Sequence, residues 1–295
     1  MYPELPIFLS GVNCMTDKPR TELSQPFDFT KPELASVFDE LSFWSSRFGA
    51  LLVDNLVIRK HQRILDIGCA TGFPLFELAH IHGPTCTLVG VDIWKAALDR
   101  ARHKRDIYGL TNVELIEADA SQLPFPEASF DLIVSNLGIN NFADPDAVIK
   151  ECFRVAADRA RIVLTTNLFG HMAEVYQVFR ETLVRINKPH YLPKLAEQEH
   201  HRLSIDRVTA LLESNGFQIT HLAQQKFHLR FADGTAMLHH ALVKFGFLEG
   251  WLSAVSPDDE PEVYCEWEED LNQLAHHAGE INTTIPMLLV EAVKV

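Results

Sequence analysis

The chain has 295 residues, enough for one large domain or for a core domain with a smaller one. Hydrophobic residues make up 47% and charged residues 22%, which argues against extensive disorder. The formal net charge of −14 argues against a nucleic-acid partner and against a polybasic membrane contact, because both need clustered Lys and Arg.

The cysteines are odd in number and show no paired spacing, so we expect free thiols and no disulfide framework or zinc site. No apolar run reaches the length of a membrane span, and no cationic leader precedes an apolar core at the N-terminus. These features predict a cytoplasmic protein with no membrane contact. The five cysteines are Cys14, Cys69, Cys86, Cys152 and Cys265.

The first 30 residues carry Pro, Ser and Thr with little periodicity, and we interpret residues 1–30 as a flexible tail. Met15 is a second plausible start, so the residues before it need not be native. From Pro32 onward apolar residues recur at helical spacing, which predicts an N-terminal helical cover over residues 31–60. Residues 31–295, which include this cover, are predicted to form one domain.

The stretch from Arg63 to Pro74 contains the strongest local pattern. Its apolar run at residues 64–67 suits a buried parallel strand, and small residues then allow a tight turn close to a ligand. From Leu75 the pattern becomes helical. A strand, a glycine turn and a helix in this order begin a nucleotide-binding crossover unit.

Four more strands alternate with helices along the first half of the chain, which predicts a mainly parallel, doubly wound sheet. We expect these strands at Thr87–Val91, Val113–Glu117, Phe130–Asn136 and Arg161–Thr166, and helices at Lys95–Ile107 and Pro145–Val155.

The second half is less regular. Helices are expected at Met172–Ile186 and Ser204–Ser214, strands at Gln218–Leu222 and Lys226–Phe231, and a closing strand at Ile285–Val293. Between them, residues 227–284 form a helical insertion whose acidic part, Ser256–Asp270, should be exposed. The segment Phe227–Leu252 is the expected substrate cover, and its aromatic residues and Met237 suit either a wall of the substrate pocket or a homodimer face, so both remain open.

The order of these signals resembles the class I S-adenosylmethionine-dependent methyltransferases over roughly Arg63–Asn167. Residues Asp66–Gly72 look like the acidic, glycine-rich first motif of that family, with Ala70 in place of the usual middle glycine. The segment Leu123–Pro126, followed by Ser129–Asp131, is similar to quinone-biosynthesis methyltransferases and to carrier-protein methyltransferases of biotin synthesis.

The resemblance implies an α/β, Rossmann-like fold with a mostly parallel seven-stranded sheet, and S-adenosyl-L-methionine as the cofactor. It implies that Asp92 accepts hydrogen bonds from the ribose hydroxyls, that Asp119 binds the adenine, and that the fourth strand ends beside the methionine. The implied cofactor-binding residues are Asp66, Gly68, Cys69, Ala70, Gly72, Asp92, Ile93, Trp94, Asp119, Ala120, Asn136, Leu137 and Gly138.

The chemistry of these residues agrees with that cofactor. S-adenosylmethionine carries a sulfonium cation and no phosphate, and residues 65–90 contain no Lys or Arg. The G-x-G-x-x-G spacing of a dinucleotide site is absent, which disfavours NAD. Either Ile93 or Trp94 could stack on the adenine, the alternative being that Trp94 packs on a helix.

Candidate catalytic residues are Asn140, Asn141 and His171, near the ends of the fourth and fifth strands, while Asn167, His239 and His240 are weaker candidates. A general base is needed only if the acceptor carries a proton, and His171 could equally be a capping or surface residue. The histidine pairs have no carboxylate or cysteine at ligand spacing, so no metal is expected.

The sequence thus predicts a methyltransferase that acts on a small or carrier-linked organic acceptor by direct displacement. O-, N- and C-methylation are all open. A catalytically silent S-adenosylmethionine-binding partner or regulatory protein is the alternative, and an NAD-dependent dehydrogenase is a weaker third possibility.

Overall fold

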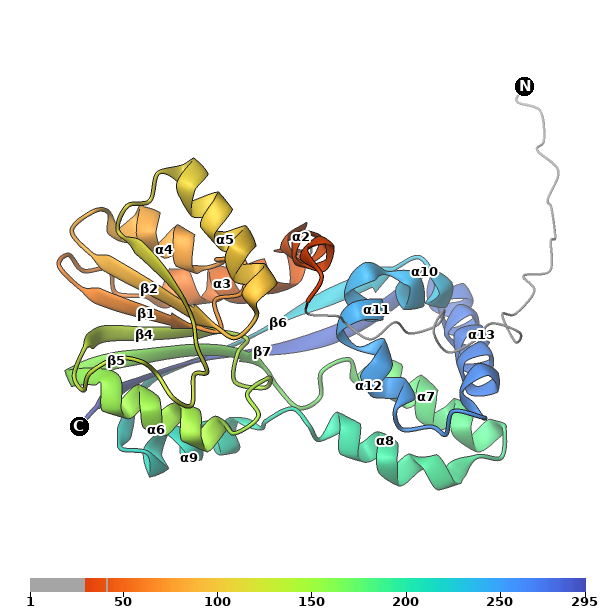
Figure 1. The fold of residues 1–295 in the computed structure, drawn as a ribbon. Helices are drawn as coiled ribbons and strands as arrows, with labels where there is room; N and C mark the ends of the chain where they lie inside the picture. Colours follow the sequence, from red (N-terminus) through yellow and green to blue (C-terminus); the bar gives the residue numbers. More distant parts are fainter. Residues whose placement is uncertain (1–29, 41) are drawn as a thin grey trace. The chain divides into compact units, whose positions relative to one another are not determined.

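The computed structural model describes residues 30–40 and 42–295 (Figure 1). The described residues fall into two compact units. The sheet unit holds residues 30–176, 196–230 and 282–295, and the helical unit holds residues 177–195 and 231–281. Apart from Thr30, the predicted tail lies outside the described residues.

The sheet unit is built on a seven-stranded sheet with the strand order β3-β2-β1-β4-β5-β7-β6. The pairs among β1 to β5 are parallel, whereas β7 runs antiparallel to β5 from Arg161 opposite Val293 to Asn167 opposite Met287. The predicted fold class is confirmed. The strands are β1 Arg63–Ile67, β2 Thr87–Asp92, β3 Val113–Glu117, β4 Phe130–Asn136, β5 Ala156–Asn167, β6 Phe217–Phe231 and β7 Ile281–Lys294.

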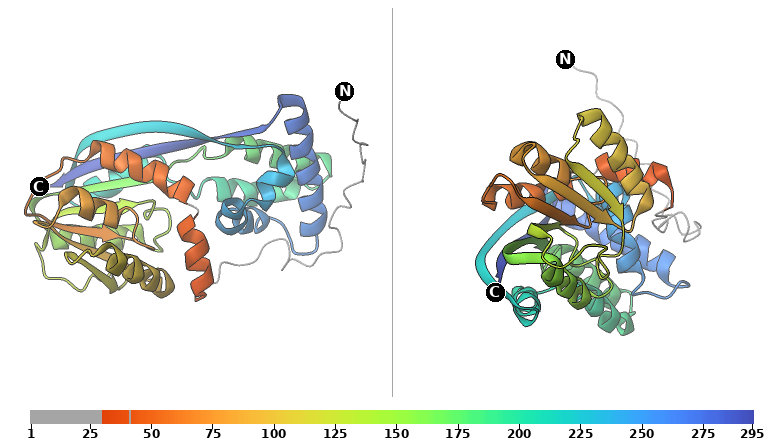
Figure 2. Two further views of the ribbon diagram at one scale, coloured as in Figure 1. Left: turned by 90° about the horizontal axis from the view of Figure 1, so that it is seen from above. Right: turned by 60° about the vertical axis from the view of Figure 1, so that its left-hand side comes forward.

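Helices cover both faces of this sheet, with α4 and α5 on one side and α6 and α9 on the other (Figures 1 and 2). The central strand β1 is therefore buried from Ile64 to Ile67, as its apolar residues Ile64, Leu65 and Ile67 predict, and Asp66 is buried with them. The sheet unit's helices are α2 Pro32–Glu40, α3 Ser42–Asn55, α4 Leu75–His82, α5 Lys95–Tyr108, α6 Pro145–Val155 and α9 Ile205–Ser214.

Two predicted helix ends are confirmed in detail. The Ser204 hydroxyl accepts the backbone N–H of Arg207 at 3.3 Å, which caps α9. The helix α6 begins at Pro145, where Asp144 accepts the N–H of Ala147 at 3.0 Å.

The strand β6 joins two segments that the sequence separates. Ala223, Gln224 and Gln225 lie between the two predicted strands, Gln218–Leu222 and Lys226–Phe231, and in the structure they belong to one continuous strand. Because β6 is an edge strand with most of its residues exposed or half-buried, polar side chains fit there without interrupting it. The helices that follow begin at Gly234, later than the predicted start at residue 227.

The helical unit has its own apolar centre around Trp267, which is fully buried. The Trp267 ring stacks on Phe179 with centroids 4.3 Å apart and meets Trp251 edge-on at 5.4 Å. The elements are the end of α7 Ala173–Arg185, η1 Pro189–Tyr191, the start of α8 Leu192–Glu199, α10 Gly234–His239, α11 Ala241–Gly246, α12 Leu248–Leu252 and α13 Glu260–Ala278.

The expectation that Ser256–Asp270 is exposed is wrong for much of this segment. Helix α13 buries Val263 and Trp267 together with the acidic Glu260. Other acidic residues form ion pairs, such as Asp270 with Arg185 at 2.8 Å. The prediction rested on the number of acidic residues and overlooked the apolar residues that form one face of the helix.

Three of the cysteines, Cys69, Cys86 and Cys152, are free and buried, as expected. Cys265 in α13 is disulfide-bonded, so the expectation of free thiols is wrong for this residue. Within the described part of the chain, none of the helices is long and apolar enough to cross a membrane.

Candidate cofactor and acceptor site

The glycine turn between β1 and α4 needs residues that tolerate a left-handed backbone. Gly68, Ala70 and Gly72 have φ of 74°, 44° and 98°. The N–H of Gly68 donates to the carbonyl of Val91 at 2.8 Å, which ties the turn to the end of β2. The turn is therefore fixed beside the carboxyl ends of two parallel strands, where ligands bind in sheets of this kind.

Gly72 is the position in this turn where a side chain is least tolerated. A Cβ placed there would lie 2.1 Å from the buried ring of Phe76, whereas a Cβ on Gly83, at a φ of 72°, would meet nothing within 4 Å. We expect Gly72→Ala to lower the free energy of unfolding by about 1–3 kcal/mol more than Gly83→Ala does. Urea denaturation of the two variants measures this difference, and equal losses would contradict the steric explanation.

The Asp92 carboxylate, at the end of β2, organises this part of the site. Its Oδ2 accepts the N–H of Ala70 and its Oδ1 accepts the N–H of Trp94, both at 2.8 Å. Burial raises the pKa of Asp92, against the opposing effect of the backbone N–H groups. Because a carboxylate oxygen can accept two hydrogen bonds, the oriented Asp92 retains capacity for two ribose hydroxyls.

Asp119 lies one strand further along the same edge of the sheet, after β3. Its Oδ1 accepts the N–H and the hydroxyl of Ser121, both at 2.8 Å, and these bonds lower the pKa of Asp119. Oδ2 makes no hydrogen bond with any residue that the structure describes, and the side chain is exposed. An exposed, oriented oxygen of this kind suits the exocyclic amino group of adenine. The next residue, Ala120, is buried.

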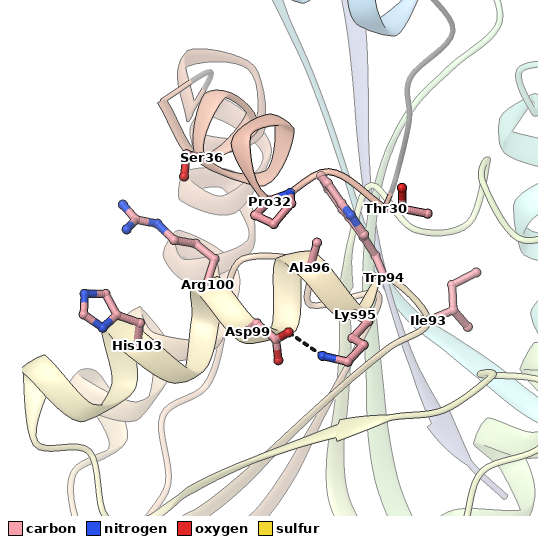
Figure 3. Close-up of a pocket in the computed structure, with 10 residues that line it drawn as sticks. All are labelled: Thr30, Pro32, Ser36, Ile93, Trp94, Lys95, Ala96, Asp99, Arg100 and His103. Carbon is pink, nitrogen blue, oxygen red and sulfur yellow. Dashed lines mark hydrogen bonds and ion pairs between the residues drawn. The ribbon is translucent and has the colours of Figure 1, made fainter.

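The two residues after Asp92 have different surroundings. The Trp94 ring packs edge-on against Phe38 of α2 at 5.3 Å and is buried with Ala35 and Ala97, whereas Ile93 is 72% exposed. Figure 3 shows Trp94 beside Pro32 at the start of α2, with Ile93 pointing away from that helix. Ile93 is therefore the residue that could cover an adenine. Trp94 packs on a helix, which was the alternative prediction.

A surface pocket of about 650 Å³ lies between α2 and α5 on the side of Trp94 (Figure 3). Its lining includes Lys95, Asp99 and Arg100, but neither the glycine turn nor Asp92 or Asp119. Lys95 is paired with Asp99, and Arg100 with Asp39. We do not assign the cofactor to this pocket.

Two glycines that follow β1 and β4, Gly68 and Gly138, lie close together at the start of the turn. A Cβ on Gly68 would lie 3.8 Å from the Cα of Gly138 and 3.8 Å from the Phe142 ring. Leu137, between the strand and this glycine, has a φ of 69°. The backbone of Gly138 therefore lies close to Gly68, and that residues 137 and 138 line the methionine end remains a prediction.

Two of the predicted cofactor-binding residues use their side chains for contacts within the fold. The Cys69 sulfur packs against β2, where a Cβ on Gly90 would lie 2.8 Å from it. Asn136 donates to the carbonyl of Ser45 at 3.1 Å and accepts the Thr165 hydroxyl at 2.7 Å, so it joins α3 to the sheet. At Cys69 and Asn136, only the backbone groups are available to contact a ligand.

Asp66 gives the most direct evidence that a cationic cofactor fits. The residue is fully buried, and neither of its carboxylate oxygens makes a close hydrogen bond within the described chain. Burial and the nearby charge of Asp92 raise the pKa of Asp66 well above its ordinary value, while the N–H of Leu75 opposes them. A buried carboxylate of this kind suits the ammonium group of S-adenosylmethionine, and no Lys or Arg of residues 65–90 competes for it.

The predicted catalytic asparagines differ in burial. Asn140 is buried, and its Nδ2 donates to the Thr166 hydroxyl at 2.7 Å and to the carbonyl and side-chain oxygens of Asn167 at 2.9 and 3.1 Å. Asn141 is exposed, and its amide donates to the carbonyl of Leu137 at 3.0 Å. The structure thus joins Asn140, and not Asn141, to a buried amide cluster at the ends of β4 and β5.

His171 is also buried, so the surface alternative for this residue is wrong. Burial and the positive charge of Arg202 lower the pKa of His171 to about 3. Its ring lies edge-on to Trp44, with centroids 5.5 Å apart. Since a group with so low a pKa holds a proton weakly near neutral pH, His171 is poorly suited to act as a general base.

Sequence reasoning missed two residues that the structure brings to this side of the sheet. Thr166 holds Asn140, and Arg202 lies near His171. The position of Thr166 at the end of β5 was a usable signal, but nothing in the sequence around Arg202 indicates its neighbours. Within the described part of the chain, no group of three or more His, Cys, Asp or Glu could hold a metal ion.

Comparison with known proteins agrees with this geometry. A family model described as a methyltransferase domain matches residues 58–216, which is more than half of the chain. The chain is 26% identical over 191 residues to a ubiquinone/menaquinone biosynthesis C-methyltransferase of Haemophilus ducreyi, covering 61% of this chain and 74% of the relative. It is 36% identical over 127 residues to a demethylmenaquinone methyltransferase of Geobacillus kaustophilus, covering 42% of this chain and 54% of the relative.

Solved structures share the fold. A putative methyltransferase from Bacillus halodurans aligns with a TM-score of 0.55 at 19% identity, covering 83% of this chain and 98% of the other. The YcgJ protein of Bacillus subtilis aligns with a TM-score of 0.54, also at 19% identity, covering 84% and 98%. The family match and the carboxylates at the ends of β1, β2 and β3 lead to the same conclusion: the chain belongs to the methyltransferase domain family and is a class I S-adenosylmethionine-dependent methyltransferase.

Proposed function

We propose that this protein transfers a methyl group to a small or carrier-linked organic acceptor by direct displacement. The bound cofactor supplies an electrophilic methyl group on a positively charged sulfur. The chain's own part is to hold the donor with Asp66, Asp92 and Asp119 and to orient the acceptor, since orientation provides much of the rate in such reactions.

The buried amide cluster carries this proposal. The Asn140 amide donates to three oxygen atoms of Thr166 and Asn167, so it belongs to a rigid, buried polar cluster at the carboxyl ends of β4 and β5. These strand ends adjoin the turn after β4, which we expect to line the methionine end. Polar side chains held this rigidly suit the positioning of an acceptor nucleophile.

The cluster contains no strong base. The pKa of His171 is lowered to about 3, so this residue is a poor base. The candidate residues therefore favour an acceptor that is nucleophilic without being deprotonated by the protein. The names of the relatives suggest which acceptors to test first, because one is a C-methyltransferase and another acts on demethylmenaquinone. An electron-rich ring carbon can attack the methyl group before it gives up its proton to water, so it would need less help from a protein base than a hydroxyl oxygen, which is protonated near neutral pH.

Acceptor-dependent formation of S-adenosylhomocysteine tests the proposal. We expect reduced 1,4-naphthoquinone or catechol to raise its formation above the rate without acceptor. Asn140→Ala should lower kcat by about tenfold to a hundredfold through misplacement of the acceptor, with little change in cofactor affinity. Asn141→Ala serves as the comparison and should cost less, because that side chain lies outside the cluster. Bound cofactor with no turnover on any acceptor would contradict the proposal.

A further inference from the structure

An arginine that forms no ion pair with the described residues lies on the segment that contacts the amide cluster. Arg202 is partly buried, and it forms no hydrogen bond or ion pair with the residues that the structure describes. Burial lowers the pKa of its guanidinium, and only Tyr176 opposes this effect. Proteins seldom withdraw an arginine from water without giving it an acceptor, because the loss of hydration is costly.

Backbone contacts fix Arg202 close to Asn140. The next residue, Leu203, donates its N–H to Asn140 Oδ1 at 3.5 Å and accepts the N–H of Phe169 at 3.1 Å. On the other side, the guanidinium is near enough to His171 for its charge to lower the pKa of that imidazole. Asn140 therefore touches the segment that carries Arg202 as well as Asn167.

Asn167 contributes a second donor without an acceptor. The residue is 4% exposed, and its buried Nδ2 has no hydrogen-bond partner within the described chain. The orientation of both amides is well determined, because Asn140 Nδ2 donates to the backbone carbonyl of Asn167 as well as to its Oδ1. Nδ2 is thus the group of Asn167 left to donate, and a buried amide of this kind normally has a partner.

Other arginines of the molecule show how Arg202 differs. Arg154 pairs with Glu151 at 2.7 Å, and Arg185 pairs with Asp270 at 2.8 Å. Arg161, which is also buried, has Glu291 at 3.5 Å. In a chain with a net charge of −14, carboxylates are plentiful, so a partly buried arginine without one is the exception.

From this cluster we propose that Arg202 and Asn167 bind an anionic oxygen group of the methyl acceptor, a carboxylate or a phosphate. The planar guanidinium presents parallel N–H groups that match two oxygens of such an anion, and Asn167 Nδ2 adds a donor to the same group. The inference rests on the proposed function and narrows it, because the preferred acceptor would carry an acidic group in addition to its nucleophilic atom.

The test is the binding of matched probes to protein saturated with S-adenosylhomocysteine, measured by calorimetry. 2-Naphthoate and 2-naphthamide have nearly the same shape and differ in charge, and 2-naphthyl phosphate separates phosphate from carboxylate. We expect at least one anionic probe to bind about tenfold or more tightly than the amide, as charge-assisted hydrogen bonds imply.

Two variants test whether Arg202 and Asn167 cause this preference for anionic probes. Arg202→Gln should remove it, and Asn167→Asp should weaken it by placing a like charge beside the anion. Arg207→Gln, an exposed arginine on α9, removes the same charge and should leave it unchanged. The proposal is overturned if the three probes bind equally or not at all, or if Arg202→Gln keeps the preference.

Three outcomes distinguish a failure of this inference from a failure of the proposed function. Weaker binding of S-adenosylhomocysteine itself in Arg202→Gln would mean that Arg202 holds the carboxylate of the cofactor, and it would overturn the inference alone. Methylation of a neutral acceptor as efficient as that of its carboxylate analogue, unaffected by Arg202→Gln, would do the same. An anion preference in a protein that methylates no acceptor would support the binding site and contradict the proposed function.

Discussion

Asp92→Ala is expected to weaken the binding of S-adenosylhomocysteine by about a hundredfold or more. Two hydrogen bonds from ribose hydroxyls to a charged carboxylate are worth about 1.5–3 kcal/mol each, and about 3 kcal/mol corresponds to a hundredfold change in affinity. The carboxylate is also held in place by the N–H groups of Ala70 and Trp94, so it needs little reorganisation on binding. Isothermal titration calorimetry measures the change directly.

The same two contacts create an ambiguity that a second variant resolves. Asp92→Ala removes an acceptor from the glycine turn as well as from the ribose, so part of its effect could come from a distorted turn. Asp92→Asn keeps the size and one acceptor oxygen, and it should give an intermediate loss. Asp99→Ala, on the exposed side of α5, is the control. An unchanged affinity in Asp92→Ala, with normal circular dichroism, would contradict the ribose assignment.

Asp92 and Asp119 can be predicted because each follows a short strand whose apolar pattern is legible in the sequence. The ends of parallel strands meet at one edge of a sheet, so their order along the chain places them in space. The same reasoning locates Gly68, Gly72 and Gly138. Positions that depend on local pattern and strand order can therefore be predicted from the sequence alone.

Side chains whose direction depends on distant elements cannot be predicted in this way. Whether Ile93 or Trp94 faces the ligand is decided by α2, whose Ala35 and Phe38 lie more than fifty residues earlier in the chain. The burial of His171 depends in the same way on α3, which places Trp44 against its ring. Local periodicity carries no information about such contacts.

Ala70 illustrates both kinds of information. The sequence marks it as an irregularity in a glycine-rich motif and leaves open where its methyl group points. In the structure Ala70 keeps the left-handed backbone of a glycine, with a φ of 44°, and its methyl packs against the cluster of Ala35, Trp94 and Ala97. The alanine thus accepts some backbone strain and gains contact with that cluster.

Trp267→Ala should have the largest effect on stability, lowering the free energy of unfolding of the helical unit by about 3–5 kcal/mol, as large aromatic-to-alanine changes in cores do. The Trp267 ring is fully buried and stacks on Phe179. Urea unfolding followed by circular dichroism measures the loss, and hydrogen exchange of α13 shows where it falls. Leu274→Ala, in the same helix but 37% exposed, should cost far less.

Cofactor affinity is the quantity that Trp267→Ala should leave nearly unchanged. The residues assigned to the donor, from Asp66 to Gly138, all belong to the sheet unit, whereas Trp267 lies in the helical unit. Because binding affinity depends on the groups that touch the ligand and on the elements that hold them, a cavity around Trp267 removes none of the proposed cofactor contacts. A loss of S-adenosylhomocysteine affinity comparable to that of Asp92→Ala, at a temperature where the variant is folded, would show that the helical unit takes part in holding the cofactor.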